Sequence, residues 1–270
     1  MPHLVTHRPR LARPGSRRHA DDGNHVWATL NAYCYKLGGL LFIAGSVFFF
    51  PALADYLAVG DWLFFAGSIA YLLVTGHDLL EVHQYWRAYP THSGADIIER
   101  LAAWAYVLGT IAFVIGSLCF LPSLEWVAAG AWCFIIGSLA FVVGGLVNVL
   151  QVVEAPSLLY MQLFNVTVAL FLIGSALFAA ASVPYLWHLH GAAEPTITRF
   201  AAALFVIGSV LFFGGGLATY YRGLVGQRLA AWCRASGLEE HFIHLLADEI
   251  RHKSRVTPRS GSRGRPSDAD

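Results

Sequence analysis

The sequence is poor in charged residues and has no paired cysteines. Of its 270 residues, 13% are charged and 56% are apolar, and the mean hydropathy is +0.55. A soluble domain usually has about 25% charged residues. This deficit excludes an ordinary soluble globule, a disordered chain and a disulfide-rich secreted module. It predicts an integral membrane protein, in which we interpret the four cysteines, Cys34, Cys119, Cys133 and Cys233, as small apolar residues.

Several functional signatures are also missing. No nucleotide-binding loop, catalytic triad or H-E-x-x-H pair is present, so we expect neither an enzyme nor a cofactor. The net charge of +1 gives no reason to expect a nucleic-acid partner. Residues 1–29 are basic and contain no apolar segment of the kind a secretory signal needs. We interpret them as a disordered basic arm.

Six apolar stretches are long enough to cross a bilayer. A hydrocarbon core of about 30 Å needs roughly 20 apolar residues per helix. The stretches are 31–50, 60–80, 102–121, 130–150, 162–182 and 199–219. The predicted fold is therefore an all-α membrane bundle of six transmembrane helices. In chain order we expect two-helix units over 30–88, 100–152 and 160–222, cytoplasmic amphipathic helices over 223–256 and a disordered tail over 257–270.

The basic residues predict the orientation. Cytoplasmic flanks of membrane helices collect Lys and Arg. With six spans, 17 of the 18 basic residues fall on one side, and only Arg199 falls on the other. We therefore expect both termini to be cytoplasmic.

A short motif, Phe-x-x-Gly-Ser-x-x-aromatic, recurs in all six stretches. Its Gly-Ser pairs are Gly45-Ser46, Gly67-Ser68, Gly116-Ser117, Gly137-Ser138, Gly174-Ser175 and Gly208-Ser209. The serines of the even stretches recur at steps of 70 and 71 residues, whereas those of the odd stretches recur at 71 and 58. This longer period predicts three helical hairpins, with a longer loop inside the third.

The motif places its four residues on one helix face. Gly and Ser allow close approach of helices in lipid. We expect the six serines to lie at one depth and to serve packing, each bonded to the carbonyl four residues earlier. A hydroxyl-lined constriction is the functional alternative.

The first hairpin resembles a known family. Phe42-Ile43-Ala44-Gly45-Ser46, followed by Gly60-Asp61-Trp62-Leu63-Phe64-Phe65-Ala66-Gly67-Ser68, is similar to the YrhK-like bacterial membrane proteins. The resemblance is clear over 37–86, good over 108–151 and weaker over 167–222. It implies two-helix units and a multi-pass protein of the bacterial cytoplasmic (inner) membrane. It supplies no catalytic residues.

A set of polar residues forms a candidate pocket at the cytoplasmic side. Ionisable groups inside a membrane are functional candidates and are usually paired, and we expect Lys36 to pair with Asp78. His77 and Glu81 have a spacing that can hold a metal, although we assign none. Bilayer exit, a polar pocket and a metal site all remain open here. The candidate residues are Lys36, His77, Asp78, Glu81, Asn148, Gln151 and Asn165.

Two functions compete. The first is a structural or sensory, stress-related membrane protein, and the alternative is a small-solute or ion transporter or channel. A polar path from the candidate pocket to the serine layer would favour transport, whereas a sealed aromatic plug would count against it. The expected partners are the lipid bilayer and anionic headgroups near Arg222, Arg228 and Arg234. The glycine runs Gly144-Gly145 and Gly214-Gly215-Gly216 suit either a contact with a second copy of the chain or an internal helix contact, and we favour the internal contact.

Overall fold

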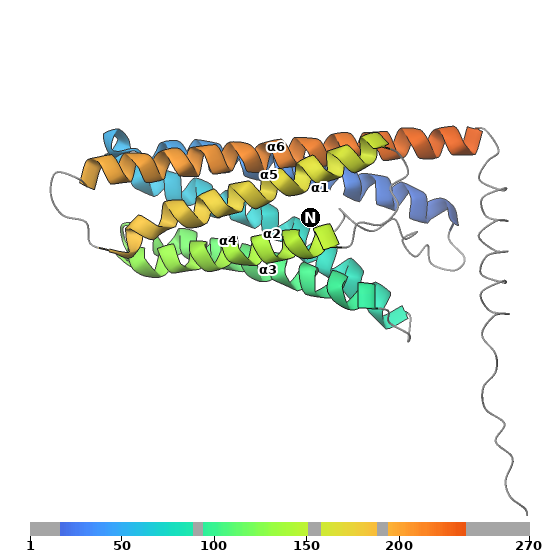
Figure 1. Ribbon diagram of the computed structural model, residues 1–270, viewed down its shortest axis with the longest axis horizontal. Coiled ribbons are helices and arrows are strands. Elements are labelled where there is room, and N and C mark those ends of the chain that lie inside the picture. Colours follow the sequence, from blue (N-terminus) through green and yellow to red (C-terminus); the bar gives the residue numbers. More distant parts are fainter. Residues whose placement is uncertain (1–16, 89–93, 151–157, 188–193, 236–270) are drawn as a thin grey trace, which may run out of the picture. The chain divides into compact units, whose positions relative to one another are not determined.

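The computed structural model describes residues 17–88, 94–150, 158–187 and 194–235 (Figure 1). In these ranges the chain forms six α-helices and two short 3-10 helices, with no strand, so the all-α fold class is confirmed. The chain divides into two units, Met1–Gly223 and Leu224–Asp270. The elements are α1 (Arg17–Val47), η2 (Pro51–Tyr56), α2 (Leu57–Ala88), α3 (Gly94–Cys119), α4 (Val127–Leu150), α5 (Leu158–Ser182), η3 (Val183–Leu186) and α6 (Glu194–Ala235).

Within the described part of the chain, five helical segments are long and apolar enough to cross a membrane. They are Pro51–Gln84, Asp96–Cys119, Val127–Val147, Gln162–Leu186 and Glu194–Arg222. This identifies a multi-pass membrane protein, although α1 is not among the five. Helix α1 begins at Arg17, ahead of the expected first span, and its N-terminal half is rich in charged and polar residues. The expected tail over 257–270, and residues 238–252 within the expected amphipathic segment, lie outside the described residues.

Large apolar side chains cover the outside of the bundle. Leu73, Leu101 and Phe200 are 64%, 60% and 63% exposed. A soluble protein rarely exposes apolar side chains in such numbers, whereas lipid is a good solvent for them. The apolar excess of the sequence thus divides between an outer surface and a core.

Prolines follow the ends of the odd-numbered helices. Proline cannot continue the helical hydrogen-bond ladder and restricts the residue before it. The helices α1, α3 and α5 end at Val47, Cys119 and Ser182, shortly before Pro51, Pro122 and Pro184.

The six helices close into a ring within the first unit. Helices α1 to α5 pack each against the next in chain order. At the α5–α6 contact, a Cβ atom added to Gly174 would lie 3.1 Å from the Gly208 carbonyl oxygen. At the α6–α1 contact, the hydroxyls of Ser46 and Ser209 lie 3.0 Å apart. The ring therefore has an axis onto which every helix can direct side chains.

We group the helices in chain order into three pairs, α1–α2, α3–α4 and α5–α6. Glycines allow the two helices of a pair to approach each other. A Cβ atom on Gly45 would lie 3.0 Å from the Gly60 carbonyl oxygen, and one on Gly137 would lie 2.8 Å from that of Gly109. Such backbone contact leaves no room for a side chain. The glycine runs at 144–145 and 214–216 also face this same chain, since Gly144 meets the Tyr106 ring and Gly215 the Phe171 ring.

The six motif serines are buried, and four of them bond within their own helix, whereas the Ser138 hydroxyl has no hydrogen-bond partner among the described residues. Ser46, Ser68, Ser117 and Ser175 each donate to the carbonyl oxygen four residues earlier, at 2.7–2.8 Å. This is the bond that the packing interpretation expects. Ser46 also contacts Ser209, so these hydroxyls touch each other across a helix interface and do not line an opening.

The motif of the fifth helix lies one heptad away from the position that the sequence predicts. The Phe178 ring, not the Phe171 ring, meets Phe42 and Phe113, with centroids 6.0 Å and 5.7 Å away. Phe178 is followed by Ala181 and Ser182, which take the places of the motif Gly and Ser. Ser182, and not Ser175, therefore lies at the depth of the other motif serines, so the prediction of one depth is wrong for Ser175. The motif search selects Ser175 because Ala181 stands where the motif has Gly.

Candidate functional site

Aromatic rings fill the axis of the bundle in three groups of three. The first ring triad is Phe49–Phe120–Tyr185, the second is Phe64–Phe134–Phe205 and the third is Phe42–Phe113–Phe178. Within each triad every pair of ring centroids lies 5.5–6.5 Å apart. Each triad takes one ring from each helix pair, so all three pairs contribute equally to the axis.

The triads contact one another without a gap. Phe49 lies 5.2 Å from Phe64, and Phe64 lies 5.2 Å from Phe42. Beyond the third triad, the Phe42 ring stacks on Tyr71 at 5.3 Å, and Tyr71 meets Tyr35 at 5.3 Å. Aromatic pairs at such distances are in van der Waals contact. The axis is therefore packed with rings from the end that carries η2 and η3 to the level of Tyr35.

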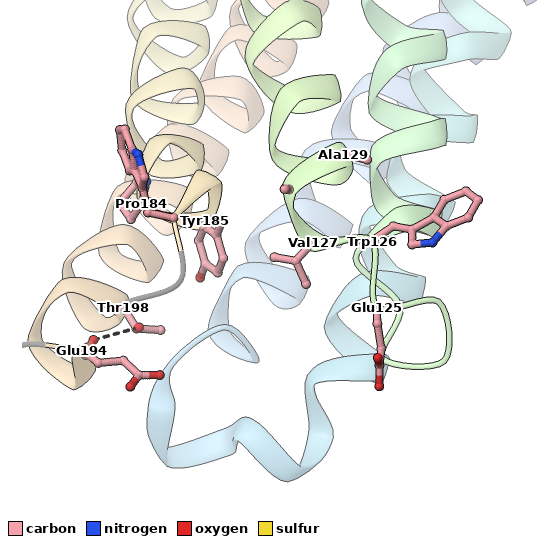
Figure 2. Close-up of a pocket in the computed structure, with 10 residues that line it drawn as sticks. Glu125, Trp126, Val127, Ala129, Pro184, Tyr185, Glu194 and Thr198 are labelled. Carbon is pink, nitrogen blue, oxygen red and sulfur yellow. Dashed lines mark hydrogen bonds between the residues drawn. The ribbon is translucent and has the colours of Figure 1, made fainter. Parts of the chain in front are cut away.

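A cavity of about 620 Å³ lies at the η2–η3 end (Figure 2). Its walls come from the start of α4, from η3 and from the start of α6. Two acidic residues, Glu125 and Glu194, line it, and Glu125 has a positive φ of 54°. Tyr185 belongs both to the cavity wall and to the first ring triad, so rings close the axis directly beneath the cavity.

Asp61 is buried near this cavity. It is 1% exposed, and neither carboxylate oxygen has a hydrogen bond within the described part of the chain. It lies within electrostatic reach of the Tyr185 hydroxyl. The corresponding residues of α4 and α6, counted from the second ring triad, are Ala131 and Ala202. Sequence reasoning missed Asp61, and the comparison of the three helix pairs is the signal that reveals it.

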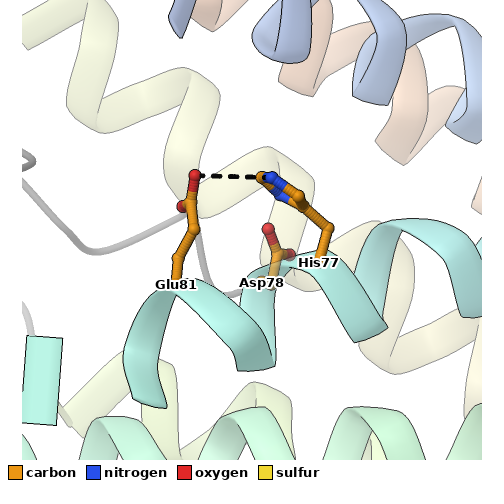
Figure 3. Close-up of side chains that lie close together, drawn as sticks. All are labelled: His77, Asp78 and Glu81. Atoms are coloured by element: carbon orange, nitrogen blue, oxygen red, sulfur yellow. Dashed lines mark ion pairs between the residues drawn. The ribbon is translucent and has the colours of Figure 1, made fainter. Parts of the chain in front are cut away.

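At the opposite end of α2, three metal-ligating side chains converge (Figure 3). One ligand atom from each of His77, Asp78 and Glu81 lies within 4.8 Å of the others. The Nε2 atom of His77 and the Oε1 atom of Glu81 are 3.8 Å apart. We call these three residues the His77 cluster.

A buried arginine lies in the same region. Arg222 of α6 is 4% exposed and Asp78 is 1% exposed. Both lie within electrostatic reach of the Tyr35 hydroxyl, which is itself buried. The expectation that Arg222 serves lipid headgroups is therefore wrong, because its guanidinium is inside the bundle. Arg228 and Arg234 have side chains outside the described residues.

Lys36 contacts aromatic rings. Its Nζ atom lies 4.3 Å from the Tyr33 ring centroid and 4.0 Å from that of Tyr220. These are cation–π distances, and they attach α1 to α6. The pairing of Lys36 with Asp78 stays a prediction.

The predicted polar pocket is brought together only in part. His77, Asp78 and Glu81 converge, whereas Asn165 is exposed on α5. The Asn148 side chain and Gln151 lie outside the described residues.

Comparison with known proteins finds one matching family model. No curated protein and no solved structure matches the chain. A family model described as YrhK-like protein matches twice, over residues 25–82 and 97–153. The first match covers the described α1–α2 pair up to the His77 cluster, and the second covers most of α3 and α4. These two segments, which lie in the first four helices, are similar to the YrhK-like family.

Proposed function

We propose that this protein is a structural membrane component of six spans, built from three two-helix units around a sealed axis. In this proposal α1 is the sixth span and α5–α6 is a third, diverged copy of the family unit. The protein neither catalyses a reaction nor conducts a solute. The end of the bundle that contains the His77 cluster, which we call the polar end, receives any signal that the protein senses. The bundle lies in the bacterial cytoplasmic membrane with both termini in the cytoplasm, in keeping with the distribution of basic residues.

The observation that carries the proposal is the set of three ring triads. Each draws one ring from every helix pair, which supports three equivalent units. Phe64, Phe134 and Phe178 are 0% exposed, so water has no access to the axis at the second and third triads. A conducting pathway needs polar groups or water along its length, and these rings supply neither.

The backbone contacts support the same proposal. The glycines bring the helices of each pair together, and five of the six motif serine hydroxyls bond within their own helix or to a neighbour. The motif residues therefore serve mainly to pack the helices, and the one serine hydroxyl without a partner, that of Ser138, is fully buried. A transport motif would be expected to leave some of its polar groups facing a path.

Flux through reconstituted protein tests the proposal. Tag-free protein in liposomes is compared with empty liposomes and with Asp78→Asn, using potassium, proton and small-solute release. We expect the parent and the variant to remain at the level of empty liposomes, while a reconstituted channel-forming peptide gives release in the same vesicles. Release by the parent that Asp78→Asn abolishes would overturn the sealed-axis proposal in favour of transport.

A further inference from the structure

The ligand atoms of the His77 cluster converge as in a metal site, at separations somewhat larger than those around a bound ion. Its three ligand atoms lie within 4.8 Å of one another, and two of them are 3.8 Å apart. Ligand atoms at bonds of 2.0–2.2 Å around a zinc-like ion lie roughly 3–3.5 Å from each other. Small changes of side-chain rotamer therefore bring the three atoms to bonding distance, because all three start from adjacent positions of one helix turn (Figure 3).

The three side chains differ in burial in a way that suits capture of an ion. Asp78 is 1% exposed and is held inside the bundle, whereas the side chains of His77 and Glu81 are 18% and 29% exposed. A fixed inner carboxylate with two partly exposed ligands leaves an entry route for a hydrated cation. Two carboxylates also balance the charge of a divalent ion.

The donor set indicates the class of metal. One imidazole with two carboxylates suits a first-row divalent transition metal such as manganese, iron or zinc. Calcium and magnesium prefer all-oxygen sites, and copper(I) prefers sulfur. The described cysteines Cys34, Cys119 and Cys133 are not among the converging ligands.

The other helix pairs show that packing does not require this cluster. Thirteen residues after the second-triad phenylalanine, α2 has His77, whereas α4 has Val147 and α6 has Ala218. Asp78 corresponds to Asn148 and Thr219, and Glu81 corresponds to Gln151 and Arg222. Neither set offers a histidine or a carboxylate. The three candidate metal ligands therefore occur only in α2, and the corresponding positions of α4 and α6 have no such ligands.

We propose that His77, Asp78 and Glu81 bind one divalent first-row transition-metal ion at the end of α2. The site is independent of the proposed structural role. The buried Arg222 lies in the same region and opposes a cation electrostatically, so the site binds with moderate affinity. The charge of the bound ion acts next to Tyr35, where α1, α2 and α6 meet. Binding of the ion therefore gives the bundle a means to respond to metal.

Metal binding by the full-length, tag-free protein in nanodiscs tests the proposal. The metal-free protein is titrated with zinc by calorimetry and with cobalt by its visible absorption, which reports ligand geometry. We expect one saturable equivalent per chain. Glu81→Gln and His77→Ala each weaken binding at least about tenfold, since even changes in outer-shell partners cost that much. Asp55→Asn, an exposed acid in η2, leaves the affinity unchanged.

The outcomes separate a site from adventitious binding. Asp78→Asn alters a buried group and can impair folding, so the two partly exposed ligands carry the decision. No saturable zinc or cobalt binding by the parent would overturn the proposal. Saturable binding that persists in both Glu81→Gln and His77→Ala would overturn it equally, because the ion would then lie elsewhere on the chain.

Discussion

The aromatic axis and the His77 end differ in how closely the three helix pairs resemble one another. Along the axis each pair supplies a phenylalanine at the same place in the second and third triads. At the His77 end the pairs supply a carboxylate, an amide and a hydroxyl at matching positions, Asp78, Asn148 and Thr219. One chain thus contains a uniform region and a divergent one.

This difference separates packing from chemistry. A ring triad needs all three rings, because the loss of one leaves a void that the other two cannot fill. A polar layer has no such requirement, so each pair can carry different groups there. The divergent end is therefore where a function is most readily added to the repeated scaffold.

The largest expected effect is at the axis. Phe178 is fully buried and meets rings of all three helix pairs. Phe178→Ala should lower the free energy of unfolding by about 3–5 kcal/mol, through lost contacts and a cavity. Denaturant titration in micelles measures it, with Phe200→Ala, 63% exposed on the same bundle, as the control at about 0.5 kcal/mol or less. Equal losses in the two variants would contradict a packed axis.

A smaller effect is expected from the glycines, and its sign should differ between the two regions. In Gly137→Ala the new Cβ atom would lie 2.7 Å from the Phe113 ring and 2.8 Å from the Gly109 carbonyl oxygen. We expect a loss of about 1–3 kcal/mol from overpacking. Gly76, beside the His77 cluster, has nothing within 4 Å, so Gly76→Ala should gain up to about 1 kcal/mol in helix propensity. The same titration checks both, and destabilisation by Gly76→Ala would remove the distinction.

The smallest effect is expected at the polar end. Lys36→Met removes the ammonium group from the Tyr33 and Tyr220 rings, which should cost about 0.5–1 kcal/mol. Lys36→Arg keeps a cation over the rings and should stay near the parent. If Lys36→Met instead costs as much as Phe178→Ala, Lys36 holds a buried partner and the polar end is as constrained as the axis.

Much of the fold follows from the motif. The repeated Phe-x-x-Gly-Ser spacing indicates helices that contact through glycine, and Gly45 and Gly137 do contact neighbouring backbone. The spacing failed in the fifth helix, where the matching string at Phe171 lies one heptad from the true counterpart at Phe178. A string match cannot detect an Ala that packs like Gly, because only the neighbouring helix shows that it does.

Some parts of the candidate site could be predicted from the sequence, and others could not. The one-turn spacing of His77 and Glu81 places them together without any tertiary contact, and they do converge. The sequence predicts headgroup contact for Arg222 because basic residues at the cytoplasmic face attract anionic lipids, but a long side chain near a helix end can also turn inward. Its direction depends on what α1 and α2 place beside it, which no local pattern encodes.

The amino-acid sequence by itself determined the helical, membrane-embedded class, the glycine contact faces and the local cluster at His77, since each depends on composition or on spacing within one helix. Only the tertiary structure decided which ring meets which across the axis, that Asp61 and Arg222 are buried, and where the fifth helix stands in register. These depend on the closure of six helices into one ring. Closure joins residues more than a hundred positions apart, such as Ser46 and Ser209, through contacts that have no signature in the local sequence.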